Sequence, residues 1–181
     1  VANGDFASRL EQQRSWLVQI DLLRRELAGF SGDIFFEFSI PRMGRRIDVV
    51  VIIGPLIFVI EFKVGESRFD RAAVEQVWDY ALDLKNFHQG SHSAMLLPIL
   101  IATETQQFAE VNFQQDPDGV FHPIKVSPER LRGVIEQVVQ KVKAEHLDVY
   151  RWSQASYLPT PTIIEAARAL YAQHSVDAIA R

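Results

Sequence analysis

Two acids and a lysine, Asp48, Glu61 and Lys63, lie in the most apolar stretch of this chain of 181 residues, RRIDVVVIIGPLIFVIEFKVG at residues 45–65. Asp48 precedes the apolar run, and Glu61 and Lys63 end it. Gly54-Pro55 suits a two-residue type II′ turn, because Gly supplies the positive φ of its first position and Pro the negative φ of its second. Counting outwards from that turn sets Asp48 opposite Glu61. Lys63 then lies on the same face as Glu61, two residues further along its strand.

A third carboxylate extends this pair if residues 41–44 connect the first strand to the next. Glu37 would then face Asp48, and Glu37, Asp48 and Glu61 would form a row on one face of the sheet. Such acids are unfavourable on an apolar sheet unless a cation lies among them, and oxygen ligands favour a hard cation such as Mg²⁺ or Mn²⁺. The row predicts metal-assisted hydrolysis of a phosphodiester, with Lys63 stabilising the developing negative charge.

Ordinary ion pairing is the alternative interpretation of the same residues. Asp48 could pair with Arg45 or Arg46, and Glu61 with Lys63, at the ends of strands. The strand context, the facing acid and the flanking apolar runs favour the metal site, because buried unpaired acids are rare.

A local basic cluster adjoins the acids. Arg42, Arg45 and Arg46 could contact the phosphates of a nucleic acid, or could be the counter-charges of Glu37, Asp48 and Glu61. The sequence leaves both uses open.

The elements that must position these residues form a mixed α/β domain. Helical spacing predicts a helix over residues 6–29, with Gly29 as its stop. Alternation predicts strands up to Ile40, over 45–53 and over 56–64, and Asp70 caps a helix that runs to about Phe87. A strand follows over 94–104, where Pro98 indicates an edge or a bulge. A further strand at 120–126 and a helix over 127–144 complete the domain.

Composition argues against some classes of function. The net charge of −4 argues against a protein that coats nucleic acid by bulk electrostatics, but leaves open an enzyme that grips phosphates locally. The chain has no cysteine, which excludes disulfides and thiolate metal sites and fits a reducing cytoplasm. No apolar run is long enough to cross a bilayer, so we expect a cytoplasmic protein without a membrane partner.

The motif Gly44-Arg-Arg-Ile-Asp48, followed by Glu61-Phe-Lys63 at a strand end, resembles the PD-(D/E)XK nuclease superfamily. Gln76 to Tyr80, QVWDY, is similar to the Gln-x-x-x-Tyr motif of its RecB-like branch. The resemblance covers residues 6 to about 105. It implies a restriction-endonuclease-like α-β-β-β-α-β core, with a mixed central sheet flanked by helices, and Mg²⁺-dependent cleavage of DNA.

The resemblance also assigns roles to individual residues. It implies that Asp48, Glu61 and the backbone carbonyl of Phe62 are metal ligands and that Lys63 is the catalytic lysine. Gln76 and Tyr80 would support the site or touch the substrate backbone. Many RecB-like members add an acid or a histidine from the first helix; Glu11 and Glu26 are the acids considered there, and Glu37 could replace that function.

A bacterial family whose longer members append a P-loop, helicase-like ATPase is similar to this chain in three stretches, residues 38–65, 78–88 and 159–171. This chain has no Gly-x-x-x-x-Gly-Lys-Ser/Thr motif. We therefore expect a nuclease-like domain at residues 1–149, then a Pro/Thr-rich linker and short helix at 150–181 that lead to an ATPase domain absent from this chain. The resemblance implies DNA and that ATPase as partners, and a homodimer is also open.

The competing function is a non-catalytic module of the same fold that binds DNA or regulates the absent motor. Among other residues, His88 and His92 lack a third ligand nearby, so loop polarity explains them better than a zinc site. Trp16, Trp78 and Trp152 fit core or docking positions better than base stacking.

Overall fold

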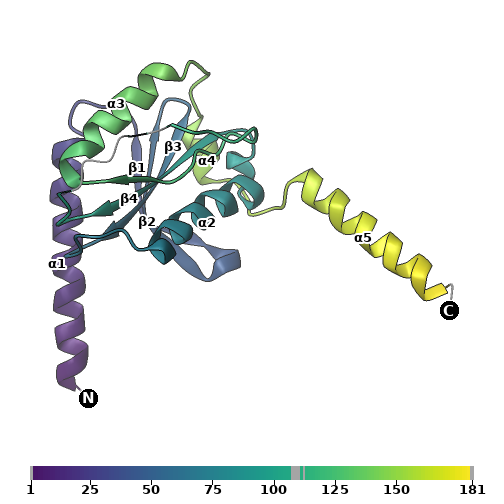
Figure 1. The fold of residues 1–181 in the computed structure, drawn as a ribbon, viewed down its shortest axis with the longest axis horizontal. Coiled ribbons are helices and arrows are strands. Elements are labelled where there is room, and N and C mark those ends of the chain that lie inside the picture. Colours follow the sequence, from purple (N-terminus) through teal and green to yellow (C-terminus); the bar gives the residue numbers. More distant parts are fainter. Residues whose placement is uncertain (1, 107–110, 112, 180–181) are drawn as a thin grey trace.

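Five strands form one mixed sheet in the computed structural model, which describes residues 2–106, 111 and 113–179. The strands lie in chain order, β1-β2-β3-β4-β5, and Figure 1 labels the first four. The first three are antiparallel to one another, whereas β3, β4 and β5 are parallel. Their bounds are β1 Asp33–Ile40, β2 Arg45–Ile53, β3 Leu56–Lys63, β4 Met95–Ala102 and β5 Ile124–Val126. The expected α/β class with a mixed sheet is confirmed.

The hairpin between β2 and β3 has the predicted register. Ile53 pairs with Leu56 across Gly54-Pro55, and Gly54 has the positive φ of 59° that its turn position requires. The β1–β2 connection also agrees, since Ile40 pairs with Arg45 around a 3₁₀ turn at Pro41–Met43.

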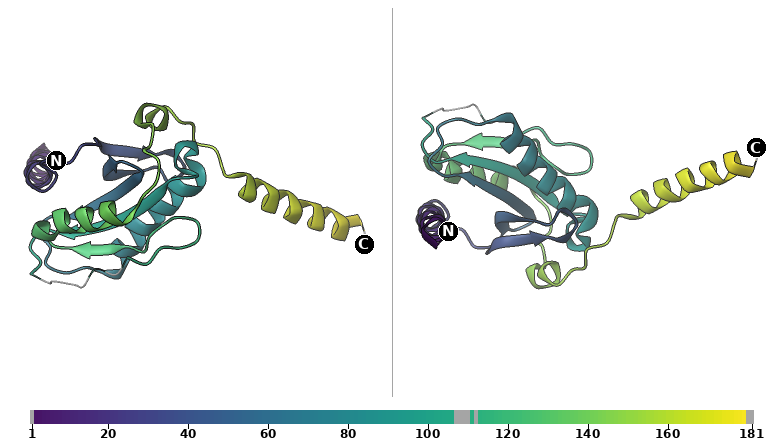
Figure 2. Two further views of the ribbon diagram at one scale, coloured as in Figure 1. Left: turned by 90° about the horizontal axis from the view of Figure 1, so that it is seen from above. Right: turned by 90° about the horizontal axis from the view of Figure 1, so that it is seen from below.

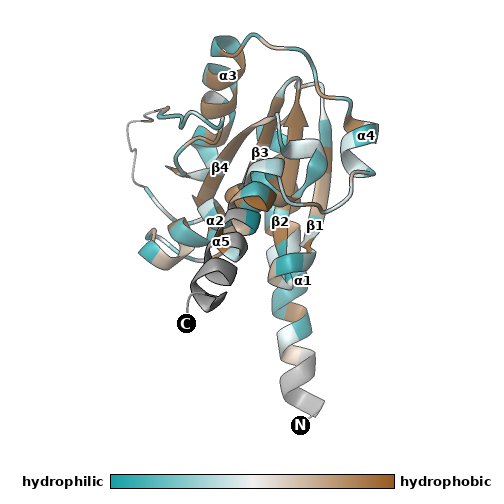
Figure 3. Ribbon diagram, turned by 90° about the vertical axis from the view of Figure 1, so that its right-hand side faces the viewer, coloured by the Kyte–Doolittle hydropathy of each residue, from teal (hydrophilic) through white to brown (hydrophobic). Residues whose placement is uncertain are grey.

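Two layers of helices cover the sheet (Figure 2). On one face, α1 (Ala2–Glu26) and α3 (Leu131–Lys141) pack against the side chains of Val49, Val51 and Phe58. On the other face, α2 (Arg71–Phe87) and α4 (Val149–Ser153) pack against Ile52, Ile57 and Val59. The strands between them are the most hydrophobic part of the molecule, and the N-terminal half of α1 extends beyond the sheet (Figure 3).

Helix ends follow local chemistry. The carboxylate of Asp70 accepts the backbone N–H of Ala73 at 2.7 Å, which confirms it as the N-cap of α2. Helix α1 begins at Ala2 and ends at Glu26, earlier at both ends than the expected 6–29. Helix α3 ends at Lys141, three residues before the expected Ala144.

Pro98 lies inside the sheet, so the expected edge position was wrong, but the alternative of a bulge fits, since three positions from Leu96 to Ile99 lie beside four from Val120 to Ile124. Strand β4 has β3 on one side and β5 on the other. The backbone N–H of Leu96 donates to Gly119 on the β5 side, so the missing N–H of Pro98 faces the same side. On that side, Val120 pairs with Leu96, and β5 pairs with β4 from Ile99 onwards. The β4 residues between these two points are unpaired on that side. Pro98 therefore removes no ladder bond.

The first part of the segment expected to be a linker, residues 150–160, packs against the domain. Trp152 of α4 is 1% exposed and belongs to the core on the α2 face. The backbone N–H groups of Leu158 and Thr160 donate to the carbonyls of Phe87 and Asn86 at the end of α2. The packed unit therefore extends to about Thr160, and α5 (Pro161–Ile179) then projects away from it (Figures 1 and 2).

No helix in the described part of the chain is both long enough and apolar enough to cross a membrane.

Candidate functional site

Strands β2 and β3 separate at the two central acids. Their backbone pairing ends at Val49 and Ile60. Beyond it, the backbone N–H of Asp48 donates to Glu61 Oε1 at 3.1 Å, and the N–H of Phe62 donates to Asp48 Oδ2 at 2.9 Å. Each carboxylate thus takes a donor from the opposite strand, which keeps the backbone satisfied where the ladder opens. The predicted apposition of Asp48 and Glu61 is confirmed.

Side-chain direction changes at this point in β2. Ile47 packs on the α2 face together with Ile52, whereas strict alternation would place Ile47 with Val49 on the α1 face. The same change occurs in β1, where Phe35 and Phe38 both pack on the α2 face. Between these two lies Glu37, whose φ of 51° is in the left-handed region.

The three acids therefore do not form the straight row that uniform alternation predicted. Glu37 and Asp48 line a pocket against α1. Glu61 and Lys63 alternate with Phe62, whose side chain lies in the core on the α1 face, so they point towards the α2 face. Asp48 lies where the two directions meet and interacts with both Glu37 and Glu61.

The two central acids resist ionisation. Burial, followed by the charge of Asp48, raises the pKa of Glu61 to about 8. Burial also raises the pKa of Asp48, and the charge of Glu37 adds to this effect. The ammonium of Lys63 lowers the pKa of both acids, without outweighing their burial. At neutral pH the pair therefore holds a proton on Glu61, shared with Asp48.

This donor set fits a divalent cation. Each carboxylate commits one oxygen to a backbone N–H, and a cation at the second oxygens would replace the proton that the pair now holds. In the described ranges of the chain, no three His, Cys, Asp or Glu side chains converge as a metal site. A cation here would thus be held by Asp48 and Glu61, with main-chain oxygen such as the carbonyl of Phe62 and water completing its shell.

Ordinary ion pairing does not account for the two acids. Among the described residues, neither Asp48 nor Glu61 lies within 4.0 Å of a cationic side chain in an ion pair. Arg46 approaches Glu37 at 3.8 Å, a weak contact between partly exposed groups. Arg45 is exposed.

Arg42 has a partner that the sequence did not indicate. Its Nε donates to Asp83 Oδ2 of α2 at 2.6 Å, and its guanidinium lies 4.2 Å from the centre of the Phe87 ring. The carboxylate of Asp83 is fully buried, so Arg42 is its counter-charge. This contact ties the β1–β2 connection to α2. Arg42 is therefore the counter-charge of Asp83 and not of the three acids, and its contact with phosphates stays a prediction.

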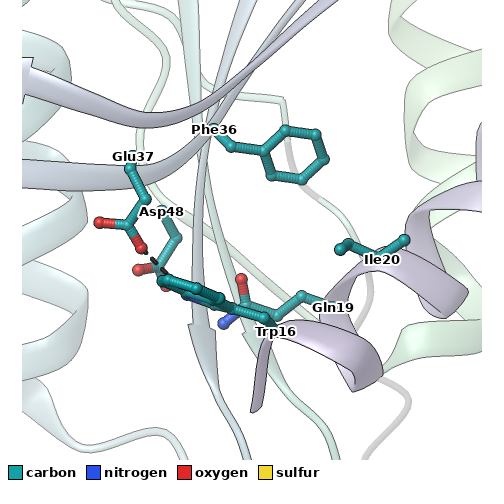
Figure 4. Close-up of a pocket in the computed structure, with 6 residues that line it drawn as sticks. All are labelled: Trp16, Gln19, Ile20, Phe36, Glu37 and Asp48. Atoms are coloured by element: carbon teal, nitrogen blue, oxygen red, sulfur yellow. Dashed lines mark hydrogen bonds between the residues drawn. The ribbon is translucent and has the colours of Figure 1, made fainter. Parts of the chain in front are cut away.

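A pocket of about 190 Å³ lies beside Asp48, between α1 and β1 (Figure 4). Trp16 lies in it with its indole Nε1 donating to Glu37 Oε1 at 3.2 Å. Sequence reasoning missed this pocket. One signal for it was present, since Gln19 is a polar residue inside the apolar stripe of α1 that contains Trp16 and Leu23. The lining residues are Trp16, Gln19, Ile20, Phe36, Glu37 and Asp48.

Neither first-helix acid considered from the sequence lies in this pocket. Glu26 pairs with Arg25 at 2.8 Å, near the C-terminal end of α1. Glu11 lines a separate shallow cavity together with Val64, roughly 22 Å from Glu26 along the helix axis. The polar residue that α1 places beside Asp48 is Gln19, an amide.

Gln76 and Tyr80 are joined on α2 by a hydrogen bond of 2.6 Å from the amide Nε2 to the phenol oxygen. Helix α2 covers the face towards which Glu61 and Lys63 point, so the pair lies on the same side of the sheet as these residues. Tyr80 is buried and Gln76 is half-buried.

The two histidines after α2 have other partners. His88 is buried with Nδ1 2.9 Å from Ser91 Oγ, and burial lowers its pKa to about 4. His92 Nε2 lies 3.1 Å from the carbonyl oxygen of Leu158. The His92 contact holds the segment after α4 against the end of α2.

Comparison of the chain with protein-family models, with curated proteins and with solved structures finds no match. The function is therefore argued from the site alone.

Proposed function

We propose that this chain is a Mg²⁺-dependent deoxyribonuclease domain of the PD-(D/E)XK superfamily, with a restriction-endonuclease-like core. The observation that carries the proposal is the pair of acids, buried Glu61 and half-buried Asp48, at the point where β2 and β3 separate, followed on β3 by Lys63. The element order α-β-β-β-α-β over residues 2–102 supports the fold. So does the parallel crossover from β3 through α2 to β4.

The chemistry assigned to each residue follows from its position. A divalent cation, when bound, would acidify a water and neutralise charge on the phosphate. Asp48 and Glu61 hold that cation, and their backbone hydrogen bonds fix the carboxylates in place before it binds. Lys63 lies near enough to both acids to affect their pKa, and stabilises negative charge on the scissile phosphate. Gln76 and Tyr80 lie on the α2 side, where they would support the site or touch the substrate backbone.

The exposed side chains of Arg45 and Arg46 are the proposed contacts to the DNA backbone. The remaining partner is a helicase-like ATPase in cis, to which α5 would lead. That proposal is supported only by the resemblance of residues 159–171 to the bacterial family described above.

Cleavage of plasmid and linear DNA with Mg²⁺ or Mn²⁺ tests the proposal. We expect Asp48→Ala and Lys63→Ala each to lower the rate by about 100-fold or more, because each removes a group that acts on the developing charge. Lys125→Ala on β5 is the matched control, since Lys125 is an exposed lysine on the other edge of the sheet and should leave the rate unchanged. Equal rates in all four proteins would identify a contaminating nuclease and refute the proposal.

A non-catalytic DNA-binding module is the second candidate. One observation favours it: no third acid or histidine joins Asp48 and Glu61 as a metal site within the part of the chain that the structure describes. This candidate predicts DNA binding that survives Asp48→Ala unchanged, together with no Mn²⁺ bound to the wild-type protein.

A further inference from the structure

Two aromatic side chains stand exposed in the pocket beside Asp48. Trp16 of α1 is 42% exposed and Phe36 of β1 is 48% exposed. They lie on opposite sides of the pocket, with Glu37 and Asp48 along one wall (Figure 4). Large apolar surface that remains open in a cavity is typical of a binding site.

The pocket is held in shape by the backbone around it. The indole of Trp16 is anchored by its hydrogen bond to Glu37, and Glu37 has an unfavourable left-handed φ. A non-glycine residue keeps such a conformation only when its surroundings enforce it, and such residues cluster at functional sites. Here the conformation turns Glu37 towards α1 and leaves Phe36 facing the pocket. The two rings are therefore presented by fixed elements.

The polar groups of the wall are mainly hydrogen-bond acceptors. Glu37 and Asp48 are carboxylates, and Gln19 adds an amide with one acceptor oxygen. Aromatic faces bind nucleobases by stacking, whatever the base. Carboxylate and amide oxygens then select bases with exocyclic amino groups, as Glu does with cytosine N4 and Gln with adenine N6.

We propose that this pocket binds one unpaired nucleobase that carries an exocyclic amino group, as cytosine, adenine and guanine do and thymine does not. The inference rests on the proposed nuclease function, and it makes single-stranded nucleic acid the substrate. A base stacked within a duplex cannot enter a pocket between two rings, whereas a base in a single strand can. Because Asp48 belongs to both the pocket and the acid pair, the bound base would lie next to the phosphodiester at the cation site.

A peptide strand added to the free edge of β1 is the other macromolecular occupant to consider. It would bond to the backbone of β1 and would bury Ile34 and Phe36, which are both exposed. It would make no use of the Trp16 indole or of the adjacent acids. A nucleobase would use both the indole and the acids, so we prefer a nucleobase as the occupant.

Binding of fluorescein-labelled 12-nucleotide probes tests the inference by anisotropy in the full chain, with Ca²⁺ or EDTA in place of Mg²⁺. We expect oligo-dC and oligo-dA to bind more tightly than oligo-dT, and all three more tightly than a blunt duplex. Trp16→Ala and Phe36→Ala should each weaken oligo-dC binding by about 5- to 150-fold. Trp16→Phe keeps a stacking face and should retain most of the affinity. Leu17→Ala removes an exposed apolar neighbour on α1 and is the matched control.

Cleavage of the same oligonucleotides without the label, in Mg²⁺, separates the nuclease proposal from the nucleobase inference. If wild type and Asp48→Ala cleave equally, the nuclease proposal fails. If wild type is active, and Trp16→Ala and Phe36→Ala bind and cleave oligo-dC as Leu17→Ala does, only the nucleobase inference is overturned. Duplex binding equal to single-strand binding, or no binding of any probe, would also overturn it. Oligonucleotide affinity that depends on Phe36 but not on Trp16 would also overturn it, because a base stacked between the two rings contacts both.

Discussion

Asp48 and Glu61 show how a residue can be unfavourable for the fold and well placed for a ligand. Each carboxylate satisfies a backbone N–H of the other strand, so replacing either removes a hydrogen bond as well as a charge. The charge itself opposes folding, because burial raises the pKa of both acids, and the charge of Asp48 raises that of Glu61 further while the charge of Glu37 raises that of Asp48. The next two predictions separate these contributions.

Glu61→Gln should remove a pH dependence of stability. Below pH 4.5 the carboxyl of Glu61 is protonated in both states, and its contribution is fully present. Between pH 4.5 and about pH 8, Glu61 keeps a proton in the folded state that it has lost in the unfolded state. The free energy of unfolding therefore falls as pH rises. Glutamine holds no such proton. We expect the variant to gain about 4 kcal/mol over wild type at pH 8 in EDTA, and little at pH 4, by urea unfolding. An unchanged slope would contradict the assignment.

Divalent cations should raise the melting temperature of the wild-type protein more at pH 8 than at pH 5. The cation and the proton compete for the same two carboxylates, and a ligand that binds only the folded state stabilises it. Thermal melts with and without Mn²⁺ measure this difference. Asp48→Ala should abolish the shift, whereas Asp79→Ala, an exposed acid on α2, should preserve it.

The elements of the sheet were predictable where a short motif decides the local backbone. Gly54-Pro55 determines the β2–β3 register, and Asp70 determines where α2 begins. The change of face at Glu37 was not predictable, because glutamate has no preference for a positive φ and the surrounding packing imposes it. The ion pair of Arg42 was not predictable either. Its partner Asp83 is 41 positions away, a distance over which charge pairing leaves no sequence pattern.

Arg42→Ala should destabilise the fold by about 3 kcal/mol, because it leaves the buried carboxylate of Asp83 without its counter-charge. Arg45→Ala, three residues along and exposed, should change stability by less than about 0.5 kcal/mol. Urea unfolding measures both. If the two variants were equally stable, Arg42 would not tie the β1–β2 connection to α2.

At the scale of the whole molecule, the packed unit is larger than composition indicated. The Pro/Thr-rich stretch after residue 150 resembles a linker, yet it returns to the core through Trp152 and hydrogen-bonds to the end of α2. The residue type of Trp152 favours a core or docking position, but a single tryptophan among polar residues carries no periodicity that would predict which surface the segment packs against. Beyond Thr160, α5 extends away from the sheet.

Trp152→Ala should therefore cost about 3–5 kcal/mol, as expected for a fully buried aromatic residue. A chain that ends at Thr160 should melt within a few degrees of the full chain, because it loses only α5. Thermal melts of the two proteins distinguish a boundary near 160 from one near 149. A large loss of stability on removing α5 would place that helix in the packed unit.

The position of the acid pair on a hairpin also affects the kinetics of folding. The two carboxylates are held by contacts only 13 and 14 positions apart in sequence, whereas β4 and β5 join the sheet through long crossovers. Short loops close first, so the repulsion between the acids acts before the rate-limiting parallel pairings form. Glu61→Gln should then speed refolding at pH 8 and leave the unfolding rate nearly unchanged, as stopped-flow measurements would show. Mn²⁺ should accelerate refolding of the wild type in the same way.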